Sequence, residues 1–278
     1  MQMLAATVAG FVGLVVGVGG IAAAAPSVDP RFTVRCEMSH RAKDDPIARP
    51  RQHGASHAHD FVGNKKTDAS STPKSLRKAP STTCSNPADS SAYWMPSLTV
   101  GGYRTSPSSV KAYYEEAGRP DTAIVAMPFG LRMIAGDSRA TAPQALAVVG
   151  WDCGAGEDQT TLAAEPPSCP DGELLLHVRF PDCWNGEVLD ASDHRSHVAY
   201  HSADGTCPPT HRMAIPRLRL KVSYQSEGGR GAKLSSGAPV TAHADFLNAW
   251  EPQEQHRLLR ACLIAGQVCD AMDSRGRP

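Results

Sequence analysis

The hydrophobic positions of this 278-residue chain fall into many short runs that are separated by Gly and Pro. Several runs alternate apolar and polar residues, as strands with one buried face do. The clearest lies at residues 217–224, where Leu218, Leu220 and Val222 alternate with basic or polar residues. Many short strands with Gly/Pro turns predict a mostly β, single-domain fold of the β-sandwich or jelly-roll kind, with long loops.

Other runs define the remaining expected elements. Strands are predicted at residues 31–36, 93–95, 98–100, 110–114, 131–135, 147–153, 174–180 and 197–200. Outside its one strand, the segment 26–80 lacks periodic apolar runs and is expected to consist mainly of loops. One helix is expected at residues 252–265, because Leu258, Cys262 and Leu263 recur at helical spacing between Pro252 and Gly266.

The first apolar run differs from the others. Residues 3–25 carry no charge and end in four alanines before Pro26. Small residues at the end of such a run predict a signal peptide over residues 1–25, although Met1-Gln2 lacks the usual basic residue. The run is also long enough for an uncleaved anchor, since roughly 20 apolar residues span a bilayer. We therefore expect a single secreted domain at residues 26–270 with no membrane association after leader cleavage, followed by a flexible tail at 271–278.

Cysteine usage supports export. All eight cysteines follow the apolar run, and an even number in an exported chain predicts a disulfide framework. A zinc site built from thiolates is the weaker alternative, because the chain has no C-x-x-C pair. Pairing of sequence neighbours gives the shortest loops. The expected bridges are Cys36–Cys84, Cys153–Cys169, Cys183–Cys207 and Cys262–Cys269.

The overall charge adds little. The 28 basic and 28 acidic side chains cancel, so composition gives no reason to expect nucleic acid as a partner.

Three short segments combine histidine with aspartate. The candidate residues in them are His57, His59 and Asp60, then His194 and His197, then His243 and Asp245. Residues two apart in an extended chain point to the same side, so each H-x-H or H-x-D pair can form half of a site. Such a set suits acid/base catalysis, or a zinc or copper site made by His57, His59, His197 and His243. Alternatively, each pair is joined by a hydrogen bond that fixes a loop and has only a structural role.

A further candidate carboxylate is Asp182, which lies between Phe180-Pro181 and Cys183-Trp184. Glycoside hydrolysis uses two carboxyl groups that flank the scissile bond, and sugars pack on exposed tryptophan rings. The alternative is that Trp151 and Trp184 pack on disulfides in the core, as tryptophan does in sandwiches.

Several of these segments together resemble a secreted family, that of domain of unknown function nineteen ninety-six. The segments are Asp44-Asp45-Pro46-Ile47, Ser56-His57-Ala58-His59-Asp60-Phe61-Val62-Gly63, Phe180-Pro181-Asp182-Cys183-Trp184-Asn185-Gly186, Asp193-His194-Arg195-Ser196-His197 and His243-Ala244-Asp245-Phe246. The resemblance covers roughly residues 36–265. It implies export and one large domain. Members occur in fungi and bacteria, in some cases beside a carbohydrate-binding WSC module, and the family has no settled activity to transfer.

Three functions are compatible with these patterns. The first is a hydrolase or lyase that acts on extracellular or cell-wall polysaccharide through a His/Asp cluster. The second is a non-catalytic carbohydrate- or wall-binding protein, in which aromatic residues form the binding face. The third is a secreted protein that binds zinc or copper through its imidazoles. If the histidines converge in space, the metal-binding protein is favoured. If they are scattered, the non-catalytic binding protein is favoured.

Overall fold

The computed structural model describes residues 29–78, 81–119, 123–154, 162–229 and 231–271. The predicted leader at residues 1–25 and the predicted tail from residue 272 onward lie outside these residues. Ala271, which we expected to begin the tail, is buried instead, and its backbone N–H donates to the carbonyl of Thr33 at 2.8 Å.

The larger sheet has six strands in the order β17-β1-β7-β14-β10-β9. Its strands are β17 (Val268–Asp270), β1 (Arg31–Cys36), β7 (Pro107–Glu115), β14 (Arg217–Gln225), β10 (Glu173–Arg179) and β9 (Val149–Cys153). All neighbours are antiparallel except β1 and β17, which run parallel. The alternation in β14 is as predicted, because Leu218, Leu220 and Val222 all lie in the main core.

The second sheet has five strands in the order β2-β3-β4-β16-β8. Its strands are β2 (Met38–Ala42), β3 (His59–Gly63), β4 (Ala92–Pro96), β16 (His243–Leu247) and β8 (Arg132–Gly136). Every residue of β3, β4 and β16 is buried, so this sheet is covered on both faces along its middle strands.

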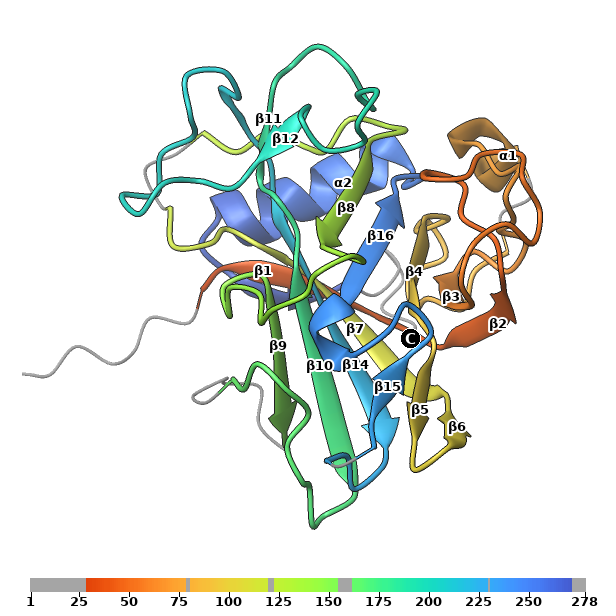
Figure 1. The fold of residues 1–278 in the computed structure, drawn as a ribbon. Coiled ribbons are helices and arrows are strands. Elements are labelled where there is room, and N and C mark those ends of the chain that lie inside the picture. The colour runs from red at the N-terminus through yellow and green to blue at the C-terminus, as the bar shows by residue number, and fades with distance from the viewer. Residues whose placement is uncertain (1–28, 79–80, 120–122, 155–161, 230, 272–278) are drawn as a thin grey trace, which may run out of the picture.

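One hydrophobic core joins the two sheets. It contains Leu220 and Leu176 from the six-stranded sheet together with Tyr93, Met133 and Phe246 from the five-stranded sheet. Figure 1 shows β16, β8 and β4 lying across β7, β10 and β14. The fold is therefore mostly β and sandwich-like, as the alternating pattern predicted.

Smaller elements complete the domain. Two three-stranded sheets have the orders β12-β11-β13 and β15-β5-β6. Their strands are β12 (Val198–Ala199), β11 (Cys183–Trp184), β13 (Met213–Ala214), β15 (Lys233–Leu234), β5 (Leu98–Val100) and β6 (Tyr103–Thr105). The short helices are α1 (Pro73–Lys78) and the 3-10 turn η1 (Pro239–Thr241).

The C-terminal helix is confirmed. Helix α2 (Pro252–Leu258) continues as a π-helical turn, η2 (Leu259–Ile264). Its start is capped by the Glu251 side chain, which accepts from the backbone N–H of Glu254, and it ends before Gly266, which has φ +66°. Leu258 and Cys262 pack into the main core.

All four predicted disulfides are present: Cys36–Cys84, Cys153–Cys169, Cys183–Cys207 and Cys262–Cys269. Removing one such bridge from a secreted domain typically costs about 2–5 kcal/mol of stability. Four bridges fit a protein of an oxidising compartment. Within the described ranges, no helix is long and apolar enough to cross a membrane.

The segment 26–80 differs from the prediction. It supplies strands β2 and β3 and helix α1 where we expected mainly loops. Strand β3 contains His59 and Asp60, whose polarity hides the alternation that identifies strands. The same holds for β16, which begins His243-Ala244-Asp245 and yet lies inside its sheet.

Candidate functional site

Strand alternation places two histidines on the outer face of the five-stranded sheet, the face turned away from the main core. In β16, Ala244 and Phe246 point into the main core, so His243 and Asp245 point outward. In β3, Val62 points into that core and His59 points outward. Both strands pair with β4, which brings these outward side chains to neighbouring positions.

A loop covers this outer face and brings the third histidine. Its centre is Asp44, whose carboxylate accepts from the backbone N–H groups of Gly54 and Ala69 at 2.8 and 3.2 Å. Ile47 anchors the same loop in a second apolar cluster with Phe61 and others. The loop at residues 43–58 therefore leads into β3 with His57 held over the sheet.

The imidazoles of His57, His59 and His243 meet at this place. Ring centroids lie 4.2 Å apart for His57 and His59, 5.1 Å for His57 and His243, and 5.9 Å for His59 and His243. One nitrogen of each ring lies within 4.8 Å of the other two. One metal ion would hold the three nitrogens closer together than this limit, since zinc–nitrogen bonds are about 2.0–2.1 Å long.

Backbone carbonyls fix the tautomers of two of these rings. Nδ1 of His59 lies 2.9 Å from the carbonyl of Asp44, and Nδ1 of His243 lies 2.8 Å from the carbonyl of Thr241. A carbonyl only accepts, so each Nδ1 carries the hydrogen and each neutral ring keeps its lone pair on Nε2. This is the second-sphere arrangement that orients metal-ligating histidines.

The Nε2 atoms have no such partner. Those of His57 and His59 are buried without a hydrogen bond, and that of His243 lies 3.9 Å from the Asp245 carboxylate. Buried polar atoms are normally paired, and a group of unpaired ones therefore suggests a missing ligand.

Burial keeps these rings neutral. It lowers the pKa of His57, and it lowers the pKa of His243 to about 4 against an opposing hydrogen bond to Thr241. Burial and the two neighbouring histidines hold the pKa of His59 well below its usual range. Neutral imidazole is the form that binds a metal ion.

A cavity of about 470 Å³ opens beside the cluster. Three carboxyl groups line it, those of Asp45, Asp193 and Asp245. Burial is the main cause that raises the pKa values of Asp45 and Asp245, and Asp45 also raises the pKa of Asp245. Three arginines also line the cavity, and His57 and His243 open into it. A metal ion held by the three histidines would lie next to this space, because His57 and His243 line it.

The structure thus brings together half of the predicted site residues. His57, His59, His243 and Asp245 form one cluster, which we call the histidine cluster. His194 lines the adjoining cavity, where its Nδ1 lies 2.8 Å from Asp190.

His197 does not join the cluster, although we expected it there. It is buried, and both of its ring nitrogens contact backbone: Nε2 lies 2.6 Å from the carbonyl of Arg132, and Nδ1 accepts from the N–H of Ala191. No nitrogen is left to bind a metal. His197 therefore fixes the loop at residues 191–197 against β8.

Asp60 points to the opposite side of β3 from His59, as alternation requires. There it forms a bidentate ion pair with Arg41 and accepts from the Ser97 hydroxyl at 2.9 Å. Its negative charge is balanced inside the fold, so this correction removes Asp60 from the site.

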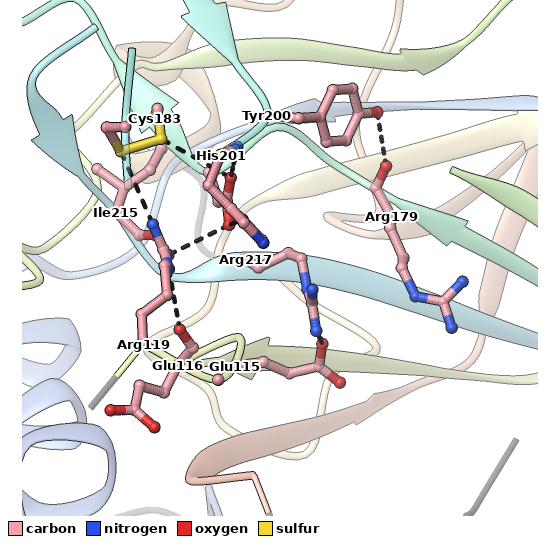
Figure 2. A network of polar contacts seen from close by, with 12 residues as sticks. Glu115, Glu116, Arg119, Arg179, Cys183, Tyr200, His201, Ile215 and Arg217 are labelled. Carbon is pink, nitrogen blue, oxygen red and sulfur yellow. Dashed lines mark hydrogen bonds and ion pairs between the residues drawn. A yellow bond between two sulfur atoms is a disulfide. The ribbon is translucent and has the colours of Figure 1, made fainter. Parts of the chain in front are cut away.

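Asp182 lies in a separate network, and Figure 2 labels its partners Arg119 and His201. Its fully buried carboxylate lies 3.2 Å from the guanidinium of Arg119 and 2.6 Å from Nδ1 of His201. Arg119 also donates to the carbonyl of Ile215 at 3.1 Å. These contacts hold the disulfide-bonded loops around β11 together. Asp182 therefore has a structural role here and does not join the histidine cluster.

Sequence reasoning missed several residues of the site. The carbonyls of Asp44 and Thr241 orient two of the imidazoles, and Asp45 lines the cavity. These roles depend on the fold of the loops, which no spacing pattern in the sequence reveals. A signal did exist for two of them, because Asp44 and Asp45 lie in one of the segments that carry the family resemblance.

The close approach of Gly136 to His243 is needed to build the site. These residues pair across β8 and β16, and Gly136 has φ +80°. A Cβ there would lie 2.5 Å from the carbonyl oxygen of Ala242 and 2.9 Å from Cα of His243. Gly136→Ala should lower the free energy of unfolding, measured by chemical denaturation, by about 1–3 kcal/mol more than the backbone strain alone would.

Gly172→Ala is the matched control for that measurement. Gly172 also has a left-handed φ of +74°, but no atom lies within 4 Å of its added Cβ. The Gly172→Ala variant should lose only about 1 kcal/mol of unfolding free energy, because it suffers the backbone strain alone. Equal losses in the two variants would show that β16 tolerates the displacement.

The comparisons with known proteins agree with the resemblance seen in the sequence. The family described as "Domain of unknown function (DUF1996)" matches residues 45–250, a segment that contains the whole histidine cluster. No curated protein and no solved structure matches this chain.

Proposed function

This chain belongs to the family described as domain of unknown function (DUF1996), and because that description assigns no activity, we propose a function from the chemistry of the site. The protein is an exported metal-dependent enzyme that binds zinc or copper through Nε2 of His57, His59 and His243. It is a hydrolase or lyase that acts on extracellular or cell-wall polysaccharide at the adjoining cavity.

One observation carries the proposal. Three neutral imidazoles converge, two of them with Nδ1–H bound to backbone carbonyls. One nitrogen of each ring lies within 4.8 Å of the other two, and the Nε2 atoms of His57 and His59 are buried without a hydrogen bond. Three protein ligands beside an open cavity are typical of catalytic zinc sites, whereas structural sites are closed by a fourth protein ligand.

The residues around the metal position have distinct roles. A bound metal ion would supply a Lewis acid and lower the pKa of a bound water. Asp245, with its Oδ2 3.9 Å from Nε2 of His243, lies where a general base or a fourth ligand is needed. Asp44 and Thr241 orient the ring planes through their carbonyls.

Most tryptophans cannot serve the non-catalytic binding protein, which needs exposed aromatic rings as a sugar-binding face. Trp94, Trp151 and Trp250 are at most 1% exposed and serve the core. The aromatic rings that a sugar could reach are those of the partly exposed Trp184 and the exposed Tyr103 and Tyr200.

Metal affinity tests the proposal. We expect His59→Ala and His243→Ala to weaken zinc or copper binding by more than about 100-fold, measured by calorimetry or by competition with a chelating dye. His256→Ala, an exposed histidine of α2, should bind as the parent protein does. If the parent binds no more tightly than His243→Ala, the metal centre is refuted.

Activity is tested separately. The metal-loaded protein should release products from a panel of wall polysaccharides, and a chelator should abolish the release. If the protein binds metal tightly but releases no product from any of these polysaccharides, it is a metal-binding protein and not an enzyme that acts on them.

A further inference from the structure

Three arginines, Arg49, Arg139 and Arg195, line the cavity beside the histidine cluster together with three aspartates. Two of the aspartates, Asp45 and Asp245, are buried, whereas Asp193 lies exposed at the rim with the arginines. Nη2 of Arg195 donates to the carbonyl of Gly136 at 2.8 Å, which fixes this guanidinium group at the rim. Guanidinium groups arranged around a cavity bind carboxylate and other oxyanions through paired N–H donors.

Two of these arginines form no ion pair with the described residues. Arg49 and Arg139 are exposed, and no carboxylate of the described residues lies within ion-pair distance of either side chain. The exposed Asp193 at the same rim is engaged with the backbone N–H groups of Arg195 and Ser196. The rim is therefore available to an external anion.

A second cavity adjoins the first. It has a volume of about 290 Å³, and both cavities are lined by Ile134 and Arg195. Tyr200 lies on its wall with 38% of its surface exposed. The Tyr200 hydroxyl donates to the carbonyl of Arg179 at 2.8 Å, which fixes the ring in place (Figure 2). A fixed, half-exposed aromatic ring offers a flat apolar surface to a sugar.

We propose that the two cavities form one groove for an acidic oligosaccharide. An anionic sugar binds among Arg49, Arg139 and Arg195 beside the histidine cluster, and a neighbouring sugar ring packs on Tyr200. The inference names the substrate class of the proposed enzyme and rests on that function for its catalytic meaning. Binding itself requires only the arginines and Tyr200.

Binding is therefore measured on the metal-free and the metal-loaded protein, by calorimetry at low and high salt. The probes are tetragalacturonate for carboxylate, a carrageenan tetrasaccharide for sulfate ester, inorganic phosphate, and cellotetraose as the neutral chain. We expect an anionic tetrasaccharide to bind at least about 10-fold more tightly than cellotetraose and to weaken with salt. The tetrasaccharide that binds more tightly shows whether the groove prefers a carboxylate or a sulfate ester. If inorganic phosphate binds as tightly as either tetrasaccharide, the proposal of an oligosaccharide groove is contradicted.

Variants locate the binding. Arg139→Gln and Arg49→Gln should each weaken the anionic tetrasaccharide by about 10-fold and leave metal affinity unchanged, whereas the exposed helix residue Arg260→Gln should change neither. Tyr200→Ala should weaken the tetrasaccharide but not the corresponding monosaccharide, and Tyr200→Phe, which keeps the ring, should bind nearly as the parent does.

The two proposals fail in different ways. A protein that binds metal through its histidines but prefers no anionic chain overturns the groove and leaves the metal centre standing. A protein that binds the anionic chain through Arg139 and Tyr200 but takes up no metal overturns the metal centre alone.

Discussion

Asp182→Ala should lower the free energy of unfolding by about 3–5 kcal/mol and leave metal affinity of the folded protein unchanged. The carboxylate is fully buried and lies 3.2 Å from the guanidinium of Arg119, whose side chain is also fully buried. Burial lowers the pKa of Arg119, and Asp182 is the largest influence that opposes this effect. Without the carboxylate, a buried cation loses its closest counter-charge.

Chemical denaturation and metal titration of the same variant check this prediction. The double variant Arg119→Met/Asp182→Leu is the control, because it removes both charges and keeps apolar volume. It should recover much of the lost stability, since replacing a buried ion pair by apolar residues is often nearly neutral. A stable Asp182→Ala protein that no longer binds metal or turns over substrate would instead return Asp182 to the catalytic site.

The sequence predicted the regular part of this fold well. Residues 217–224 and 31–36 alternate because one face of each strand packs in the main core, and the helix from Pro252 follows from its capping and spacing. The disulfides also followed from sequence proximity, because each bridge closes a loop between neighbouring cysteines. These features depend on local physics, which a single sequence records.

The candidate site was predictable only in part. Alternation explains why His243 and Asp245 of β16 share one face of the sheet, whereas His57 lies in the loop before β3 and reaches the cluster through tertiary contacts. Alternation does not apply to His194 and His197, which are three residues apart in a turn, and the ring of His197 bonds to the backbone of Arg132 and Ala191 instead. The arginine rim and the carbonyls that fix the ring tautomers come from loops, and their positions depend on tertiary contacts rather than on spacing.

His177 should make the protein strongly sensitive to acid. This residue of β10 is fully buried, and both ring nitrogens lack a hydrogen bond. Burial, together with the charges of Arg219, Arg179 and Lys221, lowers its pKa to about 3. Asp152 of β9 lies 3.9 Å from its Nε2, but the neutral ring makes no ion pair with it.

The sign of the effect follows from proton binding. Between pH 6.5 and about 3, the unfolded chain protonates this histidine and the folded protein does not, so acid favours unfolding. The two pKa values differ by about 3.5, and each pKa unit corresponds to about 1.36 kcal/mol. His177 should therefore remove about 5 kcal/mol of stability as the pH falls through this range, and the contribution is fully present above pH 6.5.

Denaturation of His177→Asn and its parent at a series of pH values isolates this contribution. Asparagine takes up no proton, so the variant should lose less stability than the parent between pH 6.5 and 3. The comparison is needed because His59 and His243 also have lowered pKa values, and they destabilise both proteins equally in acid. His256→Asn, at an exposed position of α2, should follow the parent curve. Parallel curves for His177→Asn and the parent would mean that the folded protein admits a proton to His177, with Asp152 as the carboxylate placed to receive the charged ring.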